Sequence, residues 1–352
     1  MEPPKLDNDC FALPPGVDWT PVDTALAMLR DRLQAVVATQ IVPTALTDGR
    51  IVASAIAAIR DNPPTANSAV DGYGFAHAAL GQGVQSLPLA KGRSAAGVPY
   101  DGVLPSGHAL RILTGAPLPQ GVDTVILQED IALGDSTISF HSGLKKGANT
   151  RKAGEDVTTG EVLFERGHQI CPQDIALLAS VGVGSATVFK PLRVGVLSTG
   201  DELRPTGTPA TPAQIYDANR PMLLAALRRW GMQAVDLGHV GDDRGALRDC
   251  LNRAAKTTDA ILTSGGASAG DEDHVSALLT AEGSLYTWRI AVKPGRPLVL
   301  GQWQNVPLFG LPGNPVAAFV CAMIFARPAL HILGGGTWQQ PQGFMVPAAF
   351  SK

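Results

Sequence analysis

Hydrophobic and polar positions alternate between strand and helix patterns throughout the second half of the chain. Residues 192–198 form a nearly continuous apolar run, which is typical of a central strand in a parallel sheet. Later strand patterns are separated by helical ones, with strands at 234–237, 259–263, 288–292, 297–301 and 307–310 and helices at 221–230, 245–256, 273–281 and 314–326. This alternation predicts a doubly wound α/β domain whose ligand binds beyond the carboxyl ends of the strands.

The first half of the chain has a different pattern, in which two helical stretches flank a long β-rich segment. Thr20-Pro21 is a good helix start, and apolar residues follow at helical spacing up to about residue 37. Short alternating runs predict a small all-β unit from about residue 75 to 149, and a helix returns at 172–182. We therefore expect a split N-terminal domain of residues 1–60 and 150–188, a β-rich insertion domain of residues 61–149, and an α/β domain of residues 189–334.

Composition places the chain among globular proteins. The 352 residues are 45% hydrophobic and 17% charged, which suits substantial cores and argues against disorder. The net charge is −3 and aromatic residues make up 5%, so neither a broad basic surface nor a stacking platform for nucleic acid is expected. Any phosphate should be held locally, by backbone amides and a few basic side chains.

The sequence predicts neither secretion nor membrane insertion. Cys10, Cys171, Cys250 and Cys321 are far apart and are expected to be reduced thiols. The polar N-terminus has no apolar signal core. The apolar stretch at 316–326 is interrupted by Arg327-Pro328 and is too short to cross a bilayer. We expect a cytoplasmic protein that binds neither membranes nor nucleic acid.

Four loops follow predicted strands and should meet at one rim of the α/β sheet. They are residues 198–202, 264–273, 293–297 and 310–315. In the second loop, Gly265, Gly266 and Gly270 free backbone N–H groups to point inward, and Ser264 and Ser268 add hydroxyls. This composition predicts a phosphate cradle, with a tight strand-to-helix turn as the alternative. The loop is neither a Walker loop nor a GxGxxG motif, which disfavours nucleotide triphosphatases and dinucleotide enzymes.

Acidic and basic residues concentrate on the same predicted rim. The acids are Asp201, Glu202, Asp242, Asp243, Asp271, Glu272 and Asp273. So many carboxylates would repel a phosphate unless a cation lay between them, and hard oxygen ligands suit Mg²⁺. For each single acid, a solvated turn or a helix cap is the alternative. Arg289, Lys293 and Arg296 are expected to hold phosphate or another oxyanion, or else to be solvated charges at strand ends.

A set of short motifs, taken in order, resembles those of one family. They are Asn67-Ser68-Ala69-Val70-Asp71-Gly72-Tyr73, Thr114-Gly115-Ala116-Pro117-Leu118-Pro119 with Gly121, Gly154-Glu155-Asp156, Ser198-Thr199-Gly200-Asp201-Glu202-Leu203, Thr263-Ser264-Gly265-Gly266, Lys293-Pro294-Gly295-Arg296-Pro297, and Leu311-Pro312-Gly313-Asn314-Pro315. With these motifs, roughly residues 15–335 resemble the molybdopterin molybdenumtransferases, the MoeA type that includes the C-terminal part of gephyrin.

The resemblance implies an elongated homodimer and a reaction of molybdenum cofactor biosynthesis. In that reaction the phosphoanhydride of adenylylated molybdopterin is hydrolysed with Mg²⁺, molybdate is inserted at the dithiolene, and AMP is released. The implied catalytic residues are Asp71, Asp156, Glu202 and Asp273, and the implied metal ligands are Glu202, Asp242, Asp243 and Asp273. The implied substrate-binding residues are Thr199, Gly200, Asp201, Ser264, Gly265, Gly266, Ser268, Arg289, Lys293, Arg296, Pro312, Gly313 and Asn314. Asp71 and Asp156 lie outside the α/β domain and could reach the site across the dimer.

Two departures from the family pattern bear on activity. Ala66 occupies a position where family members often carry Asp, and residues 335–352 resemble only the beginning of the family's C-terminal β domain. Two other functions therefore stay open, a molybdopterin-binding carrier or scaffold without turnover and a molybdopterin adenylyltransferase. The adenylyltransferases are usually a single α/β domain, so the β-rich insertion disfavours the second. The implied protein partners are a molybdopterin adenylyltransferase and the apo-molybdoenzymes that receive the cofactor.

Overall fold

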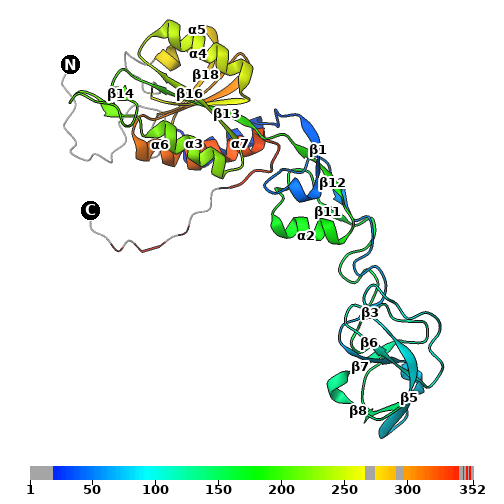
Figure 1. The fold of residues 1–352 in the computed structure, drawn as a ribbon. Coiled ribbons are helices and arrows are strands. Elements are labelled where there is room, and N and C mark those ends of the chain that lie inside the picture. Colours follow the sequence, from blue (N-terminus) through cyan, green and yellow to red (C-terminus); the bar gives the residue numbers. More distant parts are fainter. Residues whose placement is uncertain are drawn as a thin grey trace.

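Three lobes lie in a row in the computed structural model (Figure 1). The structure describes residues 19–265, 274–290 and 297–340, together with Phe344, Val346, Pro347 and Ala349. An α/β lobe lies at one end, a smaller middle lobe follows, and a β-rich distal lobe lies at the far end (Figure 1). From α1 (Val22–Arg32) in the α/β lobe the chain runs through the middle lobe to the distal lobe, and it returns through the middle lobe to the α/β lobe.

The α/β lobe is built on a six-stranded mixed sheet. Its strand order is β16-β13-β17-β20-β19-β18. Neighbours among the first four strands are parallel, whereas β19 is antiparallel to both β20 and β18. The strands are β13 (Arg193–Thr199), β16 (Gln233–Val240), β17 (Ala260–Ser264), β18 (Ser284–Arg289), β19 (Pro297–Trp303) and β20 (Val306–Leu311). The α/β fold class is confirmed, and the strand expected at 288–292 begins earlier because it pairs along its length with β19.

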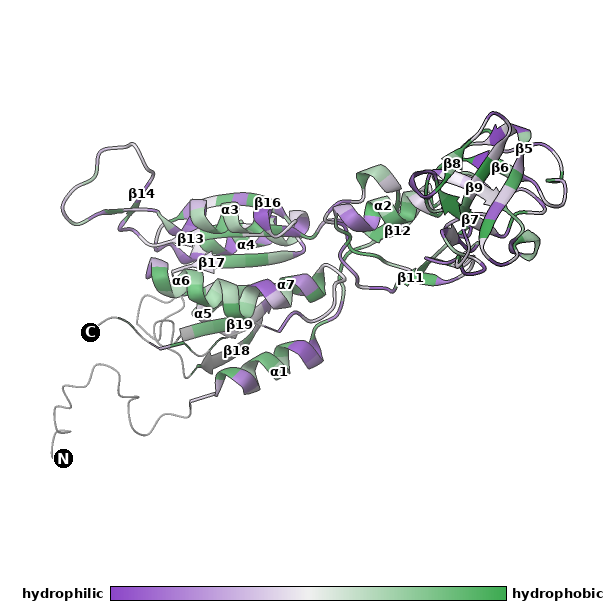
Figure 2. Ribbon diagram, turned by 90° about the horizontal axis from the view of Figure 1, so that it is seen from below, coloured by the Kyte–Doolittle hydropathy of each residue, from purple (hydrophilic) through white to green (hydrophobic). Residues whose placement is uncertain are grey.

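Helices cover both faces of this sheet (Figure 1). One face packs against α3 (Asn219–Arg229), α6 (Pro315–Cys321) and α7 (Arg327–Leu333). The other face packs against α4 (Arg244–Thr257) and α5 (His274–Glu282). Strand β17 is buried along its length, and its first three residues are apolar (Figure 2).

Helix α1 (Val22–Arg32) shares the core of the α/β lobe. Leu26 and Leu29 are buried in one cluster with Leu300 and Phe309. The expected domain boundaries place this helix in the split N-terminal domain, with the rest of residues 1–60, whereas in the structure it packs in the core of the α/β lobe. An amphipathic pattern predicts that one face of a helix is buried, but it does not say against which element.

The middle lobe combines segments from before and after the distal lobe. β1 (Thr39–Pro43) pairs antiparallel with β12 (Ser185–Phe189), and β2 (Ile56–Ala57) pairs antiparallel with β11 (Val162–Phe164). A short 3₁₀ turn follows β1 at Thr44–Leu46. Helix α2 (Pro172–Ser180) covers these pairs, and its Leu178 is fully buried in their core.

The distal lobe holds a second six-stranded sheet, with strand order β7-β4-β6-β5-β9-β8. Its strands are β4 (Gly72–Phe75), β5 (Val84–Ser94), β6 (Ala109–Ile112), β7 (Thr124–Leu127), β8 (Ala132–Leu133) and β9 (Thr137–His141), with 3₁₀ turns at His77–Ala79 and Gln128–Asp130. At its base β3 (Asn67–Ser68) pairs with β10 (Thr150–Arg151). Gly72 is required in β4, because a Cβ there would overlap the Ile126 carbonyl of the neighbouring strand.

One helical run from residue 315 to 333 is longer than the pattern predicts. A π-helical segment (Ala322–Ala326) joins α6 to α7, and Pro328 lies in the first turn of α7. The π turn changes the hydrogen-bond register of the helix, so the N–H that Pro328 lacks does not end the helix. The predicted helix end at Arg327-Pro328 is therefore wrong. By length and composition alone the segment Pro315–Leu333 could cross a membrane, with a mean hydropathy of 1.9, but 61% of it is buried within the protein. It is a core helix of the α/β lobe.

Candidate active site

A pocket opens where β13, β17 and β20 end, with a volume of about 270 Å³. This is the predicted rim, because the carboxyl ends of parallel strands meet at one edge of a sheet. Two short strands, β14 (Leu203–Arg204) and β15 (Ile215–Tyr216), border it and lead into α3. The lining residues are Thr199, Glu202, Leu203, Ile215, Tyr216, Asp217, Ala218, Asn219, Ser264, Gly265, Gly313, Asn314 and Pro315.

Asn219, at the start of α3, ties three segments of the pocket together. Its Nδ2 donates to Ser264 Oγ and to the Gly313 carbonyl, both at 2.7 Å. A carbonyl oxygen can only accept a hydrogen bond. The contact with the Gly313 carbonyl therefore shows that the amide nitrogen of Asn219, and not its oxygen, faces this group. Asn219 is absent from the predicted site. Asp217 and Asn219 come just before the helical pattern at 221–230, and Asp and Asn are residues that often begin helices. This signal could have placed both residues at a helix start that faces the ligand.

Four buried side-chain oxygens near the ends of β13 and β17 have no hydrogen-bond partner among the described residues. They are Ser198 Oγ, Thr199 Oγ1, Asn219 Oδ1 and Thr263 Oγ1. Buried polar atoms are nearly always paired, since an unpaired one destabilises the fold by about 1–3 kcal/mol. Gly265 brings the backbone close to this group, with φ +90 and a Cβ position only 2.6 Å from the Thr199 carbonyl. This arrangement is typical of a site that a polar ligand completes.

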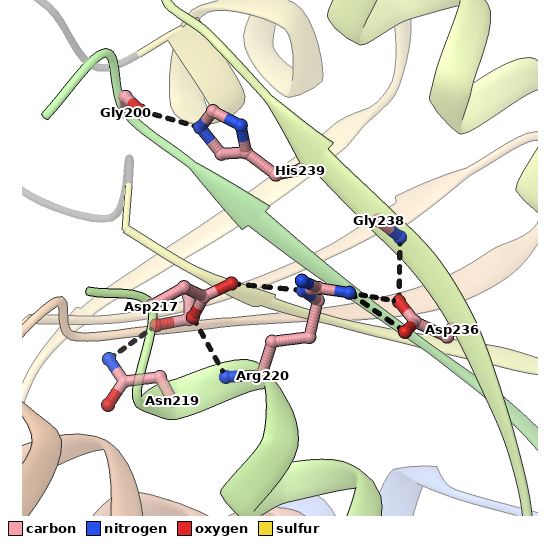
Figure 3. Close-up of polar contacts among 8 residues, drawn as sticks. Gly200, Asp217, Asn219, Arg220, Asp236, Gly238 and His239 are labelled. Atoms are coloured by element: carbon pink, nitrogen blue, oxygen red, sulfur yellow. Dashed lines mark hydrogen bonds and ion pairs between the residues drawn. The ribbon is translucent and has the colours of Figure 1, made fainter. Parts of the chain in front are cut away.

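The turn after β13 carries two of the predicted acids, Asp201 and Glu202, and hydrogen bonds with the loop after β16 hold this turn in place. Gly200 has φ +131, and a Cβ there would overlap the Glu202 carboxylate, so glycine is required. Asp201 N donates to Asp242 Oδ2 at 3.1 Å, and Asp242 N donates to Asp201 Oδ1 at 3.0 Å. His239 Nε2 lies 2.6 Å from the Gly200 carbonyl oxygen (Figure 3). Glu202 is thereby presented to the pocket, which it lines.

Two of the predicted polar residues cap helices. Asp243 Oδ1 accepts from Ala246 N at 2.7 Å as the N-cap of α4, and Asn314 Oδ1 accepts from Ala317 N at 3.1 Å at the start of α6. The helix-cap alternative therefore accounts for one oxygen of Asp243. Within the described part of the chain, no group of three or more His, Cys, Asp or Glu side chains is placed to hold a metal ion.

Arg220 lies between two carboxylates beside the pocket (Figure 3). Its Nε donates to Asp217 Oδ2 at 2.9 Å, and its Nη1 donates to both oxygens of Asp236 at 2.7 and 2.8 Å. Burial acts to raise the pKa of Asp236, but the hydrogen bonds from Arg220 and from Gly238 N outweigh it and lower that pKa. Asp217 also accepts from Arg220 N at 3.1 Å, which fixes the start of α3 and with it Asn219.

Two predicted catalytic acids lie outside this pocket. Asp71 is between β3 and β4, and Asp156 follows β10, so both belong to the distal lobe or its base, which is apart from the α/β lobe (Figure 1). Asp71 accepts from the backbone N and from Oγ1 of Thr114, both at 2.7 Å, and these bonds lower its pKa. Asp156 forms an ion pair with Arg151.

Other predicted residues lie outside the described part of the chain, so the structure does not place them. They are Gly266, Ser268, Asp273, Lys293, Arg296 and the side chain of Arg289. Thr199, Glu202, Ser264, Gly265, Gly313 and Asn314 line the pocket, and Gly200, Asp201 and Pro312 are adjacent in the chain to lining residues.

Comparison with known proteins decides the family. The region described as "MoeA N-terminal region (domain I and II)" matches residues 20–182, and the region described as "Probable molybdopterin binding domain" matches residues 195–332. The molybdopterin molybdenumtransferase of Haemophilus influenzae is 39% identical over 305 residues, which cover 86% of this chain and 75% of that protein. The chain belongs to the molybdopterin molybdenumtransferase family.

Further members of this molybdenumtransferase family are similar at the level of sequence and structure. Molybdopterin molybdenumtransferase 2 of Mycobacterium tuberculosis is 33% identical over 304 residues, covering 84% of this chain and 75% of that protein. The crystal structure of the molybdopterin biosynthesis MoeA protein from Pyrococcus horikoshii OT3 has a TM-score of 0.76 at 27% identity, covering 91% of this chain and 80% of that one. The resemblance stated from the motifs is therefore confirmed. The family places the chain among the transferases of molybdenum cofactor biosynthesis, and these comparisons favour neither a carrier nor an adenylyltransferase.

Proposed function

We propose that this chain inserts molybdate into adenylylated molybdopterin, with Mg²⁺-dependent hydrolysis of the phosphoanhydride and release of AMP. The observation that carries the proposal is the pocket of about 270 Å³ beside buried hydroxyls at the strand ends that have no hydrogen-bond partner in the described part of the chain. Every residue that lines this pocket falls within the region matched as a molybdopterin binding domain, residues 195–332. The names of the relatives, molybdopterin molybdenumtransferase, support a reaction that transfers molybdenum to molybdopterin.

The anionic part of the substrate would be held by hydroxyls, backbone amides and basic side chains. Thr199 and Ser264 supply hydroxyls, and Gly265 lets the backbone approach closely. Arg289, Lys293 and Arg296 would add positive charge for phosphate or molybdate. These groups orient the anhydride and stabilise the charge on the displaced AMP. Gly200, Asp201, Gly266, Ser268, Pro312, Gly313 and Asn314 complete the proposed binding set.

Carboxylates would hold the divalent cation. Glu202, Asp242, Asp243 and Asp273 offer only oxygen donors, and this donor chemistry fits Mg²⁺. Asp242 uses Oδ2 to fasten the turn and Asp243 uses Oδ1 to cap α4, so the second oxygen of each is the one assigned to the cation. When bound, Mg²⁺ would neutralise negative charge on the phosphate oxygens.

We further propose that Asp71 and Asp156 act in the pocket of a second copy of the chain. Within one chain the distal lobe is apart from the α/β lobe (Figure 1), so a homodimer is the arrangement that brings these acids to a pocket. Exposed apolar side chains on the middle lobe offer such a dimer a surface, with Ile41 75%, Leu46 68% and Ile59 62% exposed.

A mixing experiment tests this arrangement. Asp71→Asn and Asp273→Asn variants, each inactive alone, are unfolded, mixed in equal amounts and refolded. If the two acids meet across a dimer, half of the dimers are mixed and each has one intact site, so about a quarter of the wild-type activity returns. No recovery of activity, with dimers present by sedimentation, would place both acids in one chain's site and refute the proposal.

The reaction itself is tested by incubating the purified protein with adenylylated molybdopterin, Mg²⁺ and molybdate, and following AMP by chromatography. We expect molybdate-dependent AMP release that Asp273→Asn abolishes. Asp135→Asn, in the turn between β8 and β9, is the matched control and should keep wild-type activity. Tight pterin binding without AMP release would reject the transferase proposal in favour of a carrier.

We propose the cytoplasm as the location of this reaction. Cytoplasmic reducing conditions suit thiols such as Cys171 and Cys250, which form no disulfide. A molybdopterin adenylyltransferase would supply the substrate, and apo-molybdoenzymes would accept the product.

A further inference from the structure

His239 reaches from β16 to the turn after β13 (Figure 3). In the parallel register of the two strands His239 lies opposite Ser198, two residues before Gly200. Its Nε2 nevertheless lies 2.6 Å from the Gly200 carbonyl oxygen, so the partly buried ring extends past the end of the neighbouring strand. Because a carbonyl can only accept, Nε2 is the donor and carries the proton.

A bulge in β16 precedes this histidine. Val196 lies opposite Asp236 and Leu197 lies opposite Gly238, so Leu237 is an extra residue in the strand. Gly238 has φ +82, and its N–H donates to Asp236 Oδ1 at 2.8 Å. Bulges re-aim the side chains that follow them and occur often beside active sites.

The Gly200 carbonyl that His239 contacts is an anchor of the acidic turn. It also accepts from Leu203 N, but at 3.3 Å, so the bond from His239 is the shorter and stronger one. The Glu202 carboxylate folds back over Gly200, where a Cβ would overlap it. A rotation of the Gly200 peptide would therefore move Glu202 relative to the pocket that it lines.

We propose that His239 is a positioning residue for Glu202, acting through its hydrogen bond to the Gly200 carbonyl. The inference rests on the proposed function, in which Glu202 is catalytic and holds the cation. Because the Asp201–Asp242 exchange also holds this turn, loss of the histidine bond lowers turnover without abolishing it. The competing interpretation is that His239 only satisfies a carbonyl at the end of a strand, and it predicts a change in stability alone.

Two substitutions separate these interpretations. His239→Gln keeps a side-chain N–H near the position of Nε2, whereas His239→Leu removes it at similar size. We expect His239→Leu to lower kcat for AMP release about tenfold, as the loss of a partner that orients a metal ligand does, with KM changed less than about twofold. His239→Gln should recover most of kcat. The matched control is His77→Leu, because His77 Nε2 lies 2.9 Å from the Leu144 carbonyl in the distal lobe, and it should keep wild-type kcat.

Hydrogen exchange of residues 200–203 gives a readout that needs no substrate. We expect these amides to exchange about tenfold faster in His239→Leu than in the wild type, His239→Gln or His77→Leu, because one hydrogen bond of the turn is lost. If the wild type releases no AMP, the proposed function has failed. The hydrogen-exchange rates of residues 200–203 then test by themselves whether His239 positions the turn. Unchanged exchange in His239→Leu, wild-type kcat in that variant, or equal losses in both His239 variants would overturn the inference.

Discussion

Asp201 and Asp242 each accept a hydrogen bond from the other's backbone N–H, at 3.0 and 3.1 Å. Gly241 permits this approach, because a Cβ there would overlap Asp201 Oδ1. The exchange fastens the turn after β13 to the loop before α4, and it brings two carboxylates to the rim of the pocket. Two like charges at short range repel unless a cation neutralises them, which connects this loop geometry to the proposed Mg²⁺ site.

Asp242→Asn separates the structural role of this carboxylate from its charge. The amide oxygen can still accept from Asp201 N, but the negative charge is gone. We expect the Mg²⁺ concentration for half-maximal AMP release to rise about tenfold, as for other weakened metal sites. Asp242→Ala should show the same loss and also faster hydrogen exchange at residues 200–203. A Mg²⁺ titration in which both variants match the wild type would remove Asp242 from the cation site.

Asn219→Ala should destabilise the fold around the pocket. The substitution removes the Nδ2 that donates at 2.7 Å to the buried Ser264 hydroxyl and, in a partly buried bond, to the Gly313 carbonyl. We expect the free energy of unfolding to fall by about 1–3 kcal/mol, measured by urea denaturation. Asn219→Asp should be worse, because it places a carboxylate against the Gly313 carbonyl. An unchanged urea midpoint in both variants would show that this bridge does not hold the three segments together.

Gly335→Ala should destabilise the join between the α/β and middle lobes. Gly335 has φ +93, and a Cβ there would overlap the ring of Phe189. Gly83→Ala is the matched control, because Gly83 has φ +79 with nothing near its Cβ position. Backbone strain alone destabilises by about 1–3 kcal/mol, so we expect that loss in the control and a larger one in Gly335→Ala. Equal melting temperatures for the two variants would contradict the predicted clash.

The stability of the protein should fall in mild acid because of His331. This side chain is buried, and burial, followed by the charge of Arg327, lowers its pKa below the ordinary 6.5. As the pH falls below 6.5, the unfolded chain gains a proton that the folded chain excludes, so the free energy of unfolding decreases down to the folded-state pKa.

The comparison of the wild type with His331→Phe isolates this effect, because the other titrating groups are common to both proteins. Urea midpoints at about pH 7.5 and about pH 5.5 should differ more in the wild type than in the variant. The phenyl ring keeps the packing against Gly336, which lies on the His331 ring. The same midpoint difference in both proteins would mean that His331 titrates alike in the folded and unfolded chains.

Much of the candidate site could be predicted from sequence because parallel strands end together. Thr199, Ser264 and Gly313 are far apart in the chain, but all three line the pocket. Thr199 and Ser264 end two parallel strands of one sheet, and Gly313 lies just after a third. The presence of glycines in these loops is informative for a local reason. Gly200 and Gly265 have positive φ angles and close contacts that a side chain would not permit.

Residues whose side chains bond to a different strand or loop could not be predicted from local sequence patterns. His239 sits in a strand with no motif of its own, and its hydrogen bond to Gly200 depends on a bulge in β16. Asn219 resembles an ordinary helix start until Ser264 and Gly313 are placed beside it. The continuation of the last helix through Pro328 depends on a π turn, which the spacing of apolar residues does not reveal.

The sequence by itself determined the family, the α/β class and the strand-end loops of the site, because motifs, hydrophobic periodicity and turn chemistry are local along the chain. Only the tertiary structure decided that α1 packs in the α/β core and that Asp71 lies in a different lobe from Glu202. The physical reason is that burial of an apolar face lowers the free energy whichever partner covers it. The choice of partner is therefore made by the packing of the whole chain.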